Sequence, residues 1–289
     1  MAVDGIVVVD KPVGWTSHDV VARTRRLAGT RRVGHAGTLD PMATGVLVLG
    51  VERATRLLGH LALTEKSYDA TIRLGASTVT DDAEGDVVAT APADHVPDEQ
   101  IMAGVAALTG DLEQVPSAVS AVKVDGRRAY KRVRAGEDVR LKARPVTVSA
   151  FAVRAVRRQA ETVDVDVSVV CSSGTYVRAL ARDLGVSLSV GGHLTALRRT
   201  RVGPYVLSQA RTLEQLEESF EVLPIALAAR QAFPTREVDA DQARLVSNGG
   251  PLPGADLGPG PVAVFGPDGV FLALVEERDG RAKPLAVFV

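Results

Sequence analysis

The sequence predicts a mixed α+β protein, and three features of its pattern lead to that class. Residues 6–9 form a short apolar run that ends in a Lys-Pro and Gly turn, as buried strands often do. Residues 163–169 alternate valine with other residues, which is typical of a half-buried strand. Residues 175–185 carry a helix-start signal at Thr175 and a helix-stop signal at Gly185. Strands and helices are therefore interleaved along the chain.

The remaining elements follow from the same kinds of signal. Ser17 is expected to cap a helix over residues 18–27, and residues 46–49 read as a second buried strand. A polar, acidic loop is expected at residues 75–86, and the Asp-Gly pair at 125–126 is a strong hairpin signal. One face of a further strand is formed by alternating apolar residues, namely Tyr68, Ala70, Ile72 and Leu74.

The tail of the chain differs in composition from the rest. After about Phe233, Gly-Gly-Pro, Pro-Gly and Gly-Pro-Gly-Pro sequences separate short β-like runs at 262–265 and 270–275. We therefore expect a large domain over residues 1–230 and a small β-rich domain over residues 231–289.

Composition restricts the class of protein. A chain of 289 residues with 46% hydrophobic residues can bury a large core. No stretch approaches the roughly 18 apolar residues that span a bilayer, and residues 1–10 lack the pattern of a signal peptide. Cys171 is the single cysteine, which excludes an intrachain disulfide and a zinc site built from several cysteines. We expect a protein of the reducing cytoplasm with no membrane partner.

The net charge of −1 conceals an uneven distribution of charge. Residues 1–211 carry 28 basic and 23 acidic side chains, whereas the remainder carries 6 basic and 12 acidic ones. The basic residues also form local clusters, which are able to follow the phosphates of a nucleic acid. The same clusters equally fit a solvated surface in an arginine-rich protein, so charge alone leaves both interpretations open.

Residues 34–45, with the sequence GHAGTLDPMATG, are the most informative segment. Its glycines allow a close approach of the backbone, and Asp40 lies on a turn before a buried strand. The spacing of a phosphate-binding loop or a dinucleotide fingerprint is absent. Asp40 before Pro41 is also the arrangement of a residue that caps a one-turn helix. The segment indicates either a catalytic carboxylate or a cap.

A second informative segment is CSSGTYVRALARDLG at residues 171–185. It places Arg178 in the first turn of the expected helix, where a cation opposes the helix dipole at a cost of about 0.3–1 kcal/mol. Arg178 is therefore expected to have a specific anionic partner. A local ion pair or a phosphate fits, and so does Asp40, because arginine binds a carboxylate in a fixed geometry.

These segments resemble the bacterial TruB family of tRNA pseudouridine synthases, which modify the T-loop uridine at tRNA position 55. The resemblance extends over about residues 5–213 and keeps the family's order of motifs. The matching segments are GIVVVDKPVGWTSHDVV, GHAGTLDPMATGVLVLG, EKSYDATIRLG, TDDAEGD, CSSGTYVRALARDLG and HLTALRRTRVGPY. It implies the pseudouridine synthase fold, which has a mixed, largely antiparallel sheet with flanking helices.

The resemblance also implies a reaction and its residues. The uracil N1–ribose bond must break, and the base must turn and rejoin the ribose through C5, which suits a carboxylate nucleophile and requires no metal or redox cofactor. Asp40 matches the catalytic aspartate, and Arg178 matches the arginine that pairs with it. Tyr68 matches the tyrosine that stacks on the base and is the candidate for removing the C5 proton. From periodicity alone, Tyr68 also fits an ordinary core position.

Further residues are assigned to the RNA by the same resemblance. The base must be flipped out of the T loop, and His35 matches the histidine that fills the vacated space. Tyr176 and Leu197 match residues of the uracil pocket, and Lys11 is expected beside the site in a supporting role. The RNA backbone is assigned to basic residues of one insertion, namely Arg127, Arg128, Lys131, Arg132 and Arg134.

The expected partner is the T-arm stem-loop of tRNA, without an obligatory protein partner. The tail is PUA-like at best, because it is short, acidic and rich in Gly and Pro. Two alternatives stay open from the sequence. One is a guide-RNA-dependent synthase, against which the TSHDVV segment and the acidic tail argue. The other is a tRNA-folding chaperone whose catalysis is incidental.

Overall fold

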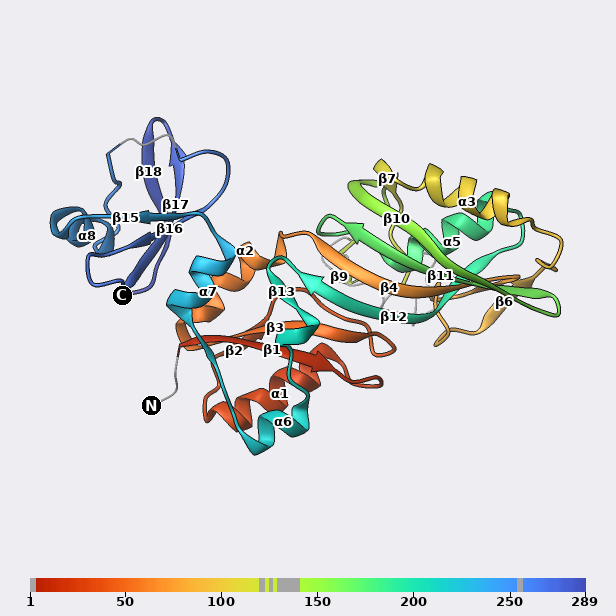
Figure 1. Ribbon diagram of the computed structural model, residues 1–289, viewed down its shortest axis with the longest axis horizontal. Coiled ribbons are helices and arrows are strands. Elements are labelled where there is room, and N and C mark those ends of the chain that lie inside the picture. Colours follow the sequence, from red (N-terminus) through yellow and green to blue (C-terminus); the bar gives the residue numbers. More distant parts are fainter. Residues whose placement is uncertain (1–3, 120–122, 125–126, 129–140, 254–256) are drawn as a thin grey trace.

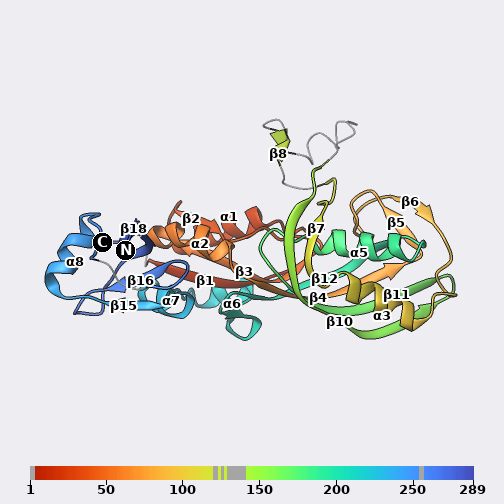
Figure 2. The ribbon, with the colours of Figure 1, turned by 90° about the horizontal axis from the view of Figure 1, so that it is seen from above.

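The computed structural model describes residues 4–119, 123–124, 127–128, 141–253 and 257–289, and for residues 123–124 and 127–128 it describes the backbone alone. The molecule is elongated, with a large sheet along its length and a small sheet at one end (Figure 1). Turned by 90°, the molecule shows the short strand β8 (Lys123–Val124) standing away from the body (Figure 2). In the described part of the chain, none of the helices has the length and apolarity that crossing a membrane requires.

A ten-stranded sheet forms the body of the molecule. Neighbouring strands run antiparallel throughout, except for the parallel pair β12 and β3. In spatial order, the main path consists of β14 (Leu223–Pro224), β1 (Gly5–Lys11), β3 (Thr44–Val51), β12 (Gly192–Val202), β4 (Lys66–Leu74), β11 (Thr162–Cys171), β10 (Arg144–Gln159) and β7 (Gly110–Gln114). Beside this path, β2 (Val33–His35) pairs with β3, and β13 (Tyr205–Val206) pairs with β12.

Helices cover the sheet in two groups. At the β1–β3 end lie α1 (Ser17–Ala28), η1 (Glu52–Leu57), α2 (Leu58–Ala62), η2 (Leu207–Gln209), α6 (Leu213–Glu218) and α7 (Ile225–Ala232). Over β10, β4 and β12 lie α3 (Asp98–Ala107) and α5 (Val177–Ser187), which also contact each other (Figure 1). The observed fold is therefore α+β with a largely antiparallel sheet, and the predicted class is confirmed.

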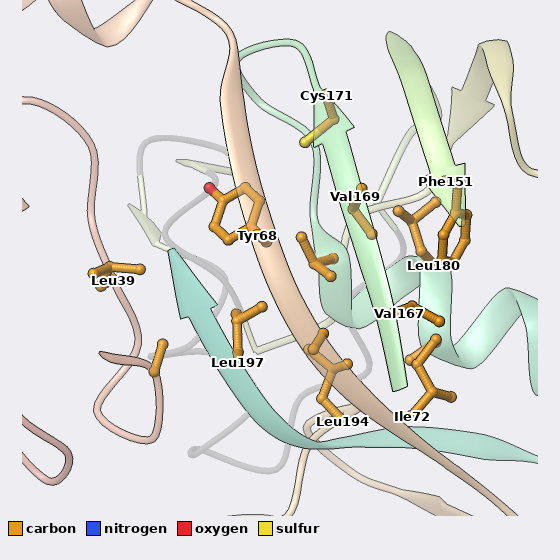
Figure 3. Packing of buried hydrophobic residues seen from close by; sticks show 14 of the residues in the cluster. Leu39, Tyr68, Ile72, Phe151, Val167, Val169, Cys171, Leu180, Leu194 and Leu197 are labelled. Atoms are coloured by element: carbon orange, nitrogen blue, oxygen red, sulfur yellow. The ribbon is translucent and has the colours of Figure 1, made fainter. Parts of the chain in front are cut away.

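The core lies between the sheet and these helices (Figure 3). The alternation predicted for β4 is confirmed, because all four apolar residues of that strand are buried. Their partners on β11 are equally buried, with Tyr68 opposite Val169 and Ile72 opposite Val165. Side chains on one face of neighbouring antiparallel strands form such pairs because successive residues alternate between the two faces.

Two helix starts differ from the prediction. Helix α1 is capped by Thr16, whose hydroxyl accepts from the Asp19 backbone N–H while the Asp19 carboxylate accepts from the Thr16 backbone. The prediction that Ser17 is the cap was wrong, since this reciprocal capping box satisfies two free N–H groups at once. Ser17 instead bonds to the backbone of Leu39.

Helix α5 begins after Tyr176 and continues through Gly185 to Ser187. The predictions of a Thr175 cap and of a stop at Gly185 were wrong. Position 185, inside the helix, requires glycine because a Cβ there would lie 2.1 Å from the backbone of Gly191. It is therefore a packing glycine that brings the helix close to the start of β12.

The tail forms a second, four-stranded sheet. Its elements are β15 (Thr235–Glu237), α8 (Ala240–Ser247), β16 (Val262–Phe265), β17 (Phe271–Arg278) and β18 (Arg281–Val287). Phe265, Phe271 and Phe288 pack in one cluster with Leu57 and Ala228, so the small sheet shares a core with the body. The predicted β-rich tail is confirmed by these strands.

Two further pairs of short strands lie outside both sheets. Strand β5 (Ala76–Thr78) pairs with β6 (Val87–Thr90), and β8 pairs with β9 (Arg127–Arg128). The second pair flanks the predicted Asp-Gly hairpin turn, whose two residues lie outside the described part of the chain.

Candidate active site

An open cavity of about 290 Å³ lies between the loop before β3, the start of β4, the end of β12 and the start of α5. Five residues predicted for the site line it together, namely Asp40, Tyr68, Tyr176, Arg178 and Leu197. These residues come from four segments that are far apart in the sequence. The fold therefore brings most of the predicted site to one place.

Asp40 lies on a turn and not on a helix. The N–H of Ala43 donates to the Asp40 carbonyl at 3.1 Å, and the N–H of Gly14 donates to the Pro41 carbonyl at 2.8 Å. On the other side, the Ser17 hydroxyl both donates to and accepts from the Leu39 backbone, at 3.1 and 2.9 Å. Asp40 thus caps no helix, and the turn that carries it is fixed at both ends by the segment at residues 14–17.

Lys11 supports this turn from behind. Its ammonium group is fully buried and donates to the carbonyls of Pro12, Trp15 and Pro41, at 2.9, 2.6 and 3.2 Å. Burial lowers the pKa of Lys11 to about 8, and the negative charge of Asp40 opposes that shift. Lys11 does not line the cavity; it connects the turn at Asp40 to the loop after β1.

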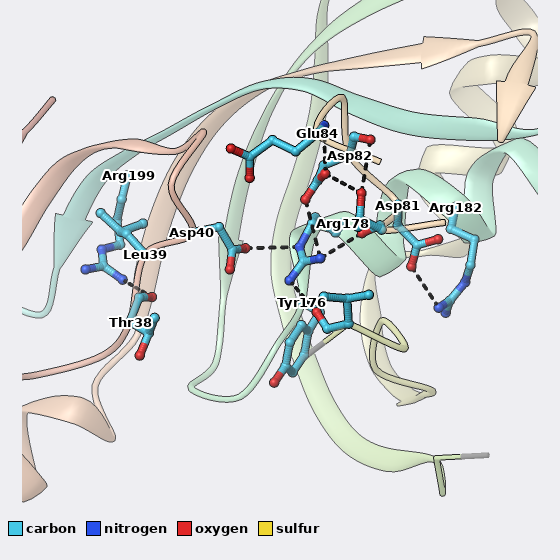
Figure 4. A network of polar contacts seen from close by, with 12 residues as sticks. Thr38, Leu39, Asp40, Asp81, Asp82, Glu84, Tyr176, Arg178, Arg182 and Arg199 are labelled. Carbon is cyan, nitrogen blue, oxygen red and sulfur yellow. Dashed lines mark hydrogen bonds and ion pairs between the residues drawn. The ribbon is translucent and has the colours of Figure 1, made fainter. Parts of the chain in front are cut away.

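Arg178 occupies the first turn of α5 and forms the ion pair with Asp40 that the sequence favours (Figure 4). Its Nε lies 3.0 Å from Asp40 Oδ2, and its Nη1 lies 3.4 Å from Asp82 Oδ2. The same guanidinium donates to the carbonyls of Thr80 and Val119, at 2.7 and 3.1 Å. With four partners, the side chain has one orientation, and it fixes the direction of the Asp40 carboxylate.

The carboxylate of Asp82 completes this network from the acidic loop at residues 75–86. Asp82 is buried and accepts from the Thr80 hydroxyl and the Glu84 backbone N–H, at 2.5 and 3.0 Å. From its sequence, this segment was expected to be a polar, acidic loop, and TDDAEGD within it is one of the segments that resemble the family. The run of acidic residues was the available signal, but it did not indicate which of them turns inward.

Tyr68 lies on β4 with its hydroxyl turned toward the loop of Leu39, beside Leu197 on β12 (Figure 3). It is almost fully buried, and burial raises the pKa of its hydroxyl. The nearby guanidinium of Arg199 opposes that rise. Tyrosine and leucine side chains from adjacent strands thus form an apolar wall of the cavity.

Arg199 and Lys66 are two basic cavity residues that the sequence analysis missed. Arg199 donates to the carbonyls of Val46, Thr38 and Gly37, at 2.7, 3.4 and 3.1 Å. Lys66 donates to the carbonyls of Ala62 and Thr64, at 2.8 and 2.7 Å. Their burial was not predictable, because lysine and arginine side chains are mostly exposed in folded proteins. These hydrogen bonds hold both cations at the cavity wall, which is therefore positively charged near Lys66 and Arg199.

Tyr176 is held by Gln114 at the end of β7. The Gln114 side chain accepts from the Tyr176 N–H at 2.8 Å and donates to the Tyr176 carbonyl at 3.1 Å. Gln114 is itself buried. This two-point contact fixes the entry to α5, and no sequence signal indicated it because Gln114 lies 62 residues away from Tyr176.

His35 lies outside the cavity, on β2. It borders a separate hollow of about 500 Å³ that is also lined by Arg31, Arg32, Arg53 and Arg56. Its ring lies edge-on to that of His18, with 5.7 Å between centroids, and burial lowers its pKa. Its Nδ1 atom is buried without a hydrogen-bond partner among the described residues.

The predicted backbone-contacting insertion cannot be placed at side-chain level. Lys131, Arg132 and Arg134 lie outside the described residues, and Arg127 and Arg128 are described only as part of β9. Their contact with RNA stays a prediction.

Gly45 on β3 pairs with Arg199 on β12, and its replacement is expected to destabilise the fold. Its φ of +99° disfavours any side chain, and a Cβ there would lie 2.2 Å from the Arg199 carbonyl oxygen on β12. We expect Gly45→Ala to lower the free energy of unfolding by at least about 3 kcal/mol in urea denaturation. Gly59→Ala is the control, because Gly59 lies in α2 with open space around it and should gain about 0.5–1 kcal/mol. Equal effects of the two changes would contradict the expectation.

The two buried lysines predict a dependence of stability on pH. Burial lowers the pKa values of Lys11 and Lys66 to about 8 from 10.5, so above pH 8 the unfolded chain binds more protons than the folded one. The free energy of unfolding should therefore rise with pH between pH 8 and 9, by roughly 1 kcal/mol per lysine. The pKa of Cys171, raised from 9.0 to about 11 by burial, acts in the opposite direction, mainly between pH 9 and 11.

Chemical denaturation at pH 7.0, 8.0 and 9.0 would measure this slope. Lys66→Met should reduce the slope by about half, whereas Lys283→Met should not change it, because Lys283 is exposed and paired with Asp279. An unchanged slope in the Lys66→Met variant would show that Lys66 does not contribute.

Three family models match successive parts of this chain. Residues 25–177 match the model described as TruB family pseudouridylate synthase (N terminal domain). Residues 178–224 match a tRNA pseudouridylate synthase B C-terminal domain. Residues 233–289 match the C-terminal model of tRNA Pseudouridine synthase II. The first match alone extends over more than half of the chain and includes Asp40 and Tyr68.

Similar proteins and structures agree with these matches. The tRNA pseudouridine synthase B of Streptomyces griseus is 64% identical over 290 residues, which cover 99% of this chain and 97% of the relative. That of Thermobifida fusca is 62% identical over 289 residues, covering 99% and 98%. Among solved structures, a Cbf5-Nop10-Gar1 complex contains a chain with a TM-score of 0.73 and 26% identity, covering 99% of this chain and 85% of that one.

Proposed function

Since this chain belongs to the TruB family of tRNA pseudouridine synthases, which are isomerases, we propose that it converts the T-loop uridine at tRNA position 55 to pseudouridine. The observation that carries the proposal is the ion pair of Asp40 with Arg178 on the wall of an open cavity. Such a pair presents a carboxylate in a fixed direction to a substrate that enters the cavity.

Asp40 is the proposed nucleophile. Its side chain keeps about a third of its surface exposed (36%), whereas that of Arg178 is almost fully buried (6%). The carboxylate is therefore accessible from the cavity while its partner is not. It attacks the ribose or assists formation of a glycal-like species, and Arg178 keeps it oriented through the reaction.

The apolar wall receives the base. Tyr68 and Leu197 are buried on adjacent strands, and a planar uracil ring stacks favourably on an aromatic side chain. Tyr68 is also the proposed acceptor of the C5 proton. Tyr176, which Gln114 holds from two sides, forms the opposite rim beside α5.

The target nucleotide reaches this cavity by flipping out of the T loop. We propose that His35 fills the space that the nucleotide leaves. Its position on a separate hollow supports this role, because that hollow is lined by four arginines that attract phosphates. Arg127, Arg128, Lys131 and Arg132 are proposed to contact the RNA backbone.

The test is release of tritium from uridine C5. The protein, without added metal or nucleotide, is incubated with an unmodified tRNA transcript that carries tritium at uridine C5. Release to water that disappears when the T-loop uridine is replaced by cytidine supports both the reaction and the position. Tight tRNA binding without any release would contradict the proposal and favour a binding protein.

A further inference from the structure

Two buried cations of the cavity have no carboxylate partner. Lys66 is 6% exposed and Arg199 is 1% exposed. Both donate to backbone carbonyls, and Arg199 also interacts with the Tyr68 hydroxyl. No described carboxylate lies within ion-pair distance of either cation. The pKa of Lys66, lowered to about 8 by burial and by the neighbouring charge of Arg199, is the expected result.

Arg178, on the same cavity, provides the contrast. It is equally buried, but it has the two carboxylates of Asp40 and Asp82 as partners. A buried cation is costly unless an anion is paired with it. The three cations of the cavity lining are therefore balanced by the carboxylates of Asp40 and Asp82, and both carboxylates are already bound to Arg178. The excess positive charge remains unneutralised in the free protein.

The shape of the cavity indicates which anion neutralises it. A tRNA offers two kinds of negative charge, which are its phosphates and a base that has lost its bond to the ribose. The surfaces next to Lys66 and Arg199 are those of Tyr68 and Leu197, which suit a flat ring and not a phosphate. The charge therefore matches the base.

We propose that Lys66 and Arg199 stabilise the uracil anion that exists between the two bond changes of the reaction. The proposal rests on the function proposed above. When the C1′–N1 bond breaks, the Asp40 carboxylate bonds to C1′ in its place, and the electron pair of the broken bond stays on uracil, where the negative charge spreads over the ring nitrogens and carbonyl oxygens. After the ring turns, a C5 electron pair forms the new bond to C1′ and the Asp40 carboxylate leaves. The C5 proton then passes to a base and N1 regains a proton. No oxidant or other reactant is needed.

This role differs from holding the backbone. Fixed positive charges that act on developing negative charge in a site shielded from water lower a barrier strongly. A purely structural lysine at position 66 would hold the end of α2 through Ala62 and Thr64 and nothing more. If Lys66 stabilises the anion, the rate lost on its replacement should be smaller for a substrate whose anion is already stable. If Lys66 is purely structural, the loss should be the same for both substrates.

The experiment compares two substrates in single turnover with saturating enzyme. One tRNA transcript carries uridine at the target position, and the other carries 5-fluorouridine, whose fluorine withdraws electrons and stabilises the uracil anion. Consumption of the target nucleotide is followed by nuclease digestion and chromatography for both. We expect Lys66→Met to slow uridine consumption by about 100-fold, and 5-fluorouridine consumption by a clearly smaller factor. Lys66→Arg, which keeps the charge, should recover most of the rate.

Lys11→Met is the matched control. Lys11 is also a buried lysine bonded only to carbonyls, but it lies behind the turn and does not line the cavity. Its replacement should slow both substrates by the same factor, because it disturbs the position of Asp40. Arg199→Lys also keeps the positive charge. It should therefore slow the two substrates by factors that differ only slightly.

The outcomes separate the two proposals. If the wild-type protein consumes neither nucleotide, the proposed function fails. If the wild-type protein is active and Lys66→Met slows both substrates equally, the anion-stabilising role is wrong while the function stands. The same conclusion follows if Lys66→Arg is as slow as Lys66→Met.

Discussion

Replacing Asp40 by asparagine is expected to reduce pseudouridine formation by about 10⁴-fold or more, because the amide is nearly isosteric but is not a nucleophile. tRNA binding should be largely retained, since Asp40 lies on the wall of the cavity proposed to receive the target nucleotide, whereas the residues proposed to contact the RNA backbone lie in another segment. Tritium release in single turnover measures the first quantity, and filter binding measures the second.

Asp10→Asn is the matched control for this change. Asp10 is also a carboxylate bound to an arginine, Arg198, at 2.7 Å, but it does not line the cavity. Its replacement should leave turnover within about tenfold of the wild type, because an exposed ion pair contributes little. If Asp40→Asn retains similar turnover, Asp40 is not the nucleophile, and the ion pair with Arg178 serves the fold.

Arg178→Met should affect both activity and stability. It leaves the buried carboxylate of Asp82 without its cation and removes the donor from the carbonyls of Thr80 and Val119. Removing one partner of a buried pair costs about 3–5 kcal/mol, which urea denaturation would measure as a lower free energy of unfolding. Turnover should fall by about 100-fold or more, because the Asp40 carboxylate loses its fixed direction.

Arg182→Met provides the comparison, one turn further along α5. Arg182 pairs with Asp81 and Asp183 but touches neither Asp40 nor the cavity. We expect a loss of about 1 kcal/mol and nearly unchanged turnover, because this arginine is more exposed. Equal losses of stability and turnover in the two variants would contradict the special role of Arg178, because its ion pairs would then contribute no more than the more exposed pairs of Arg182.

Residues that combine a local pattern with a chemical property were predictable from the sequence. Tyr68 was placed correctly because strand alternation determines which face it occupies, and β4 keeps strict alternation over residues 68–74. Arg178 was recognised as needing an anion because its position in the first turn of α5 follows from the helix signals alone. Those local rules were sufficient even though the start of α5 was misplaced.

Residues whose role depends on distant contacts were not predictable. Arg199 is buried because its guanidinium reaches the Val46 carbonyl, 153 residues away in sequence. Gln114 and Asp82 depend in the same way on where α5 lies relative to β7 and the acidic loop. A single sequence contains no periodicity that reports such pairings, so no individual role was predicted for these side chains.

The order of strands in the large sheet also determines when the enzyme first becomes competent during its synthesis. Strand β4 carries Tyr68, yet it is completed on its two sides by β11 and β12, which are translated more than 80 residues later. Until β12 has left the ribosome, Leu197 and Arg199 are missing and the cavity lacks a wall. Because domains fold as units once their long-range pairs are available, a nascent chain that already displays Asp40 is not expected to act on RNA. We therefore expect modification to begin only after β12 has left the ribosome.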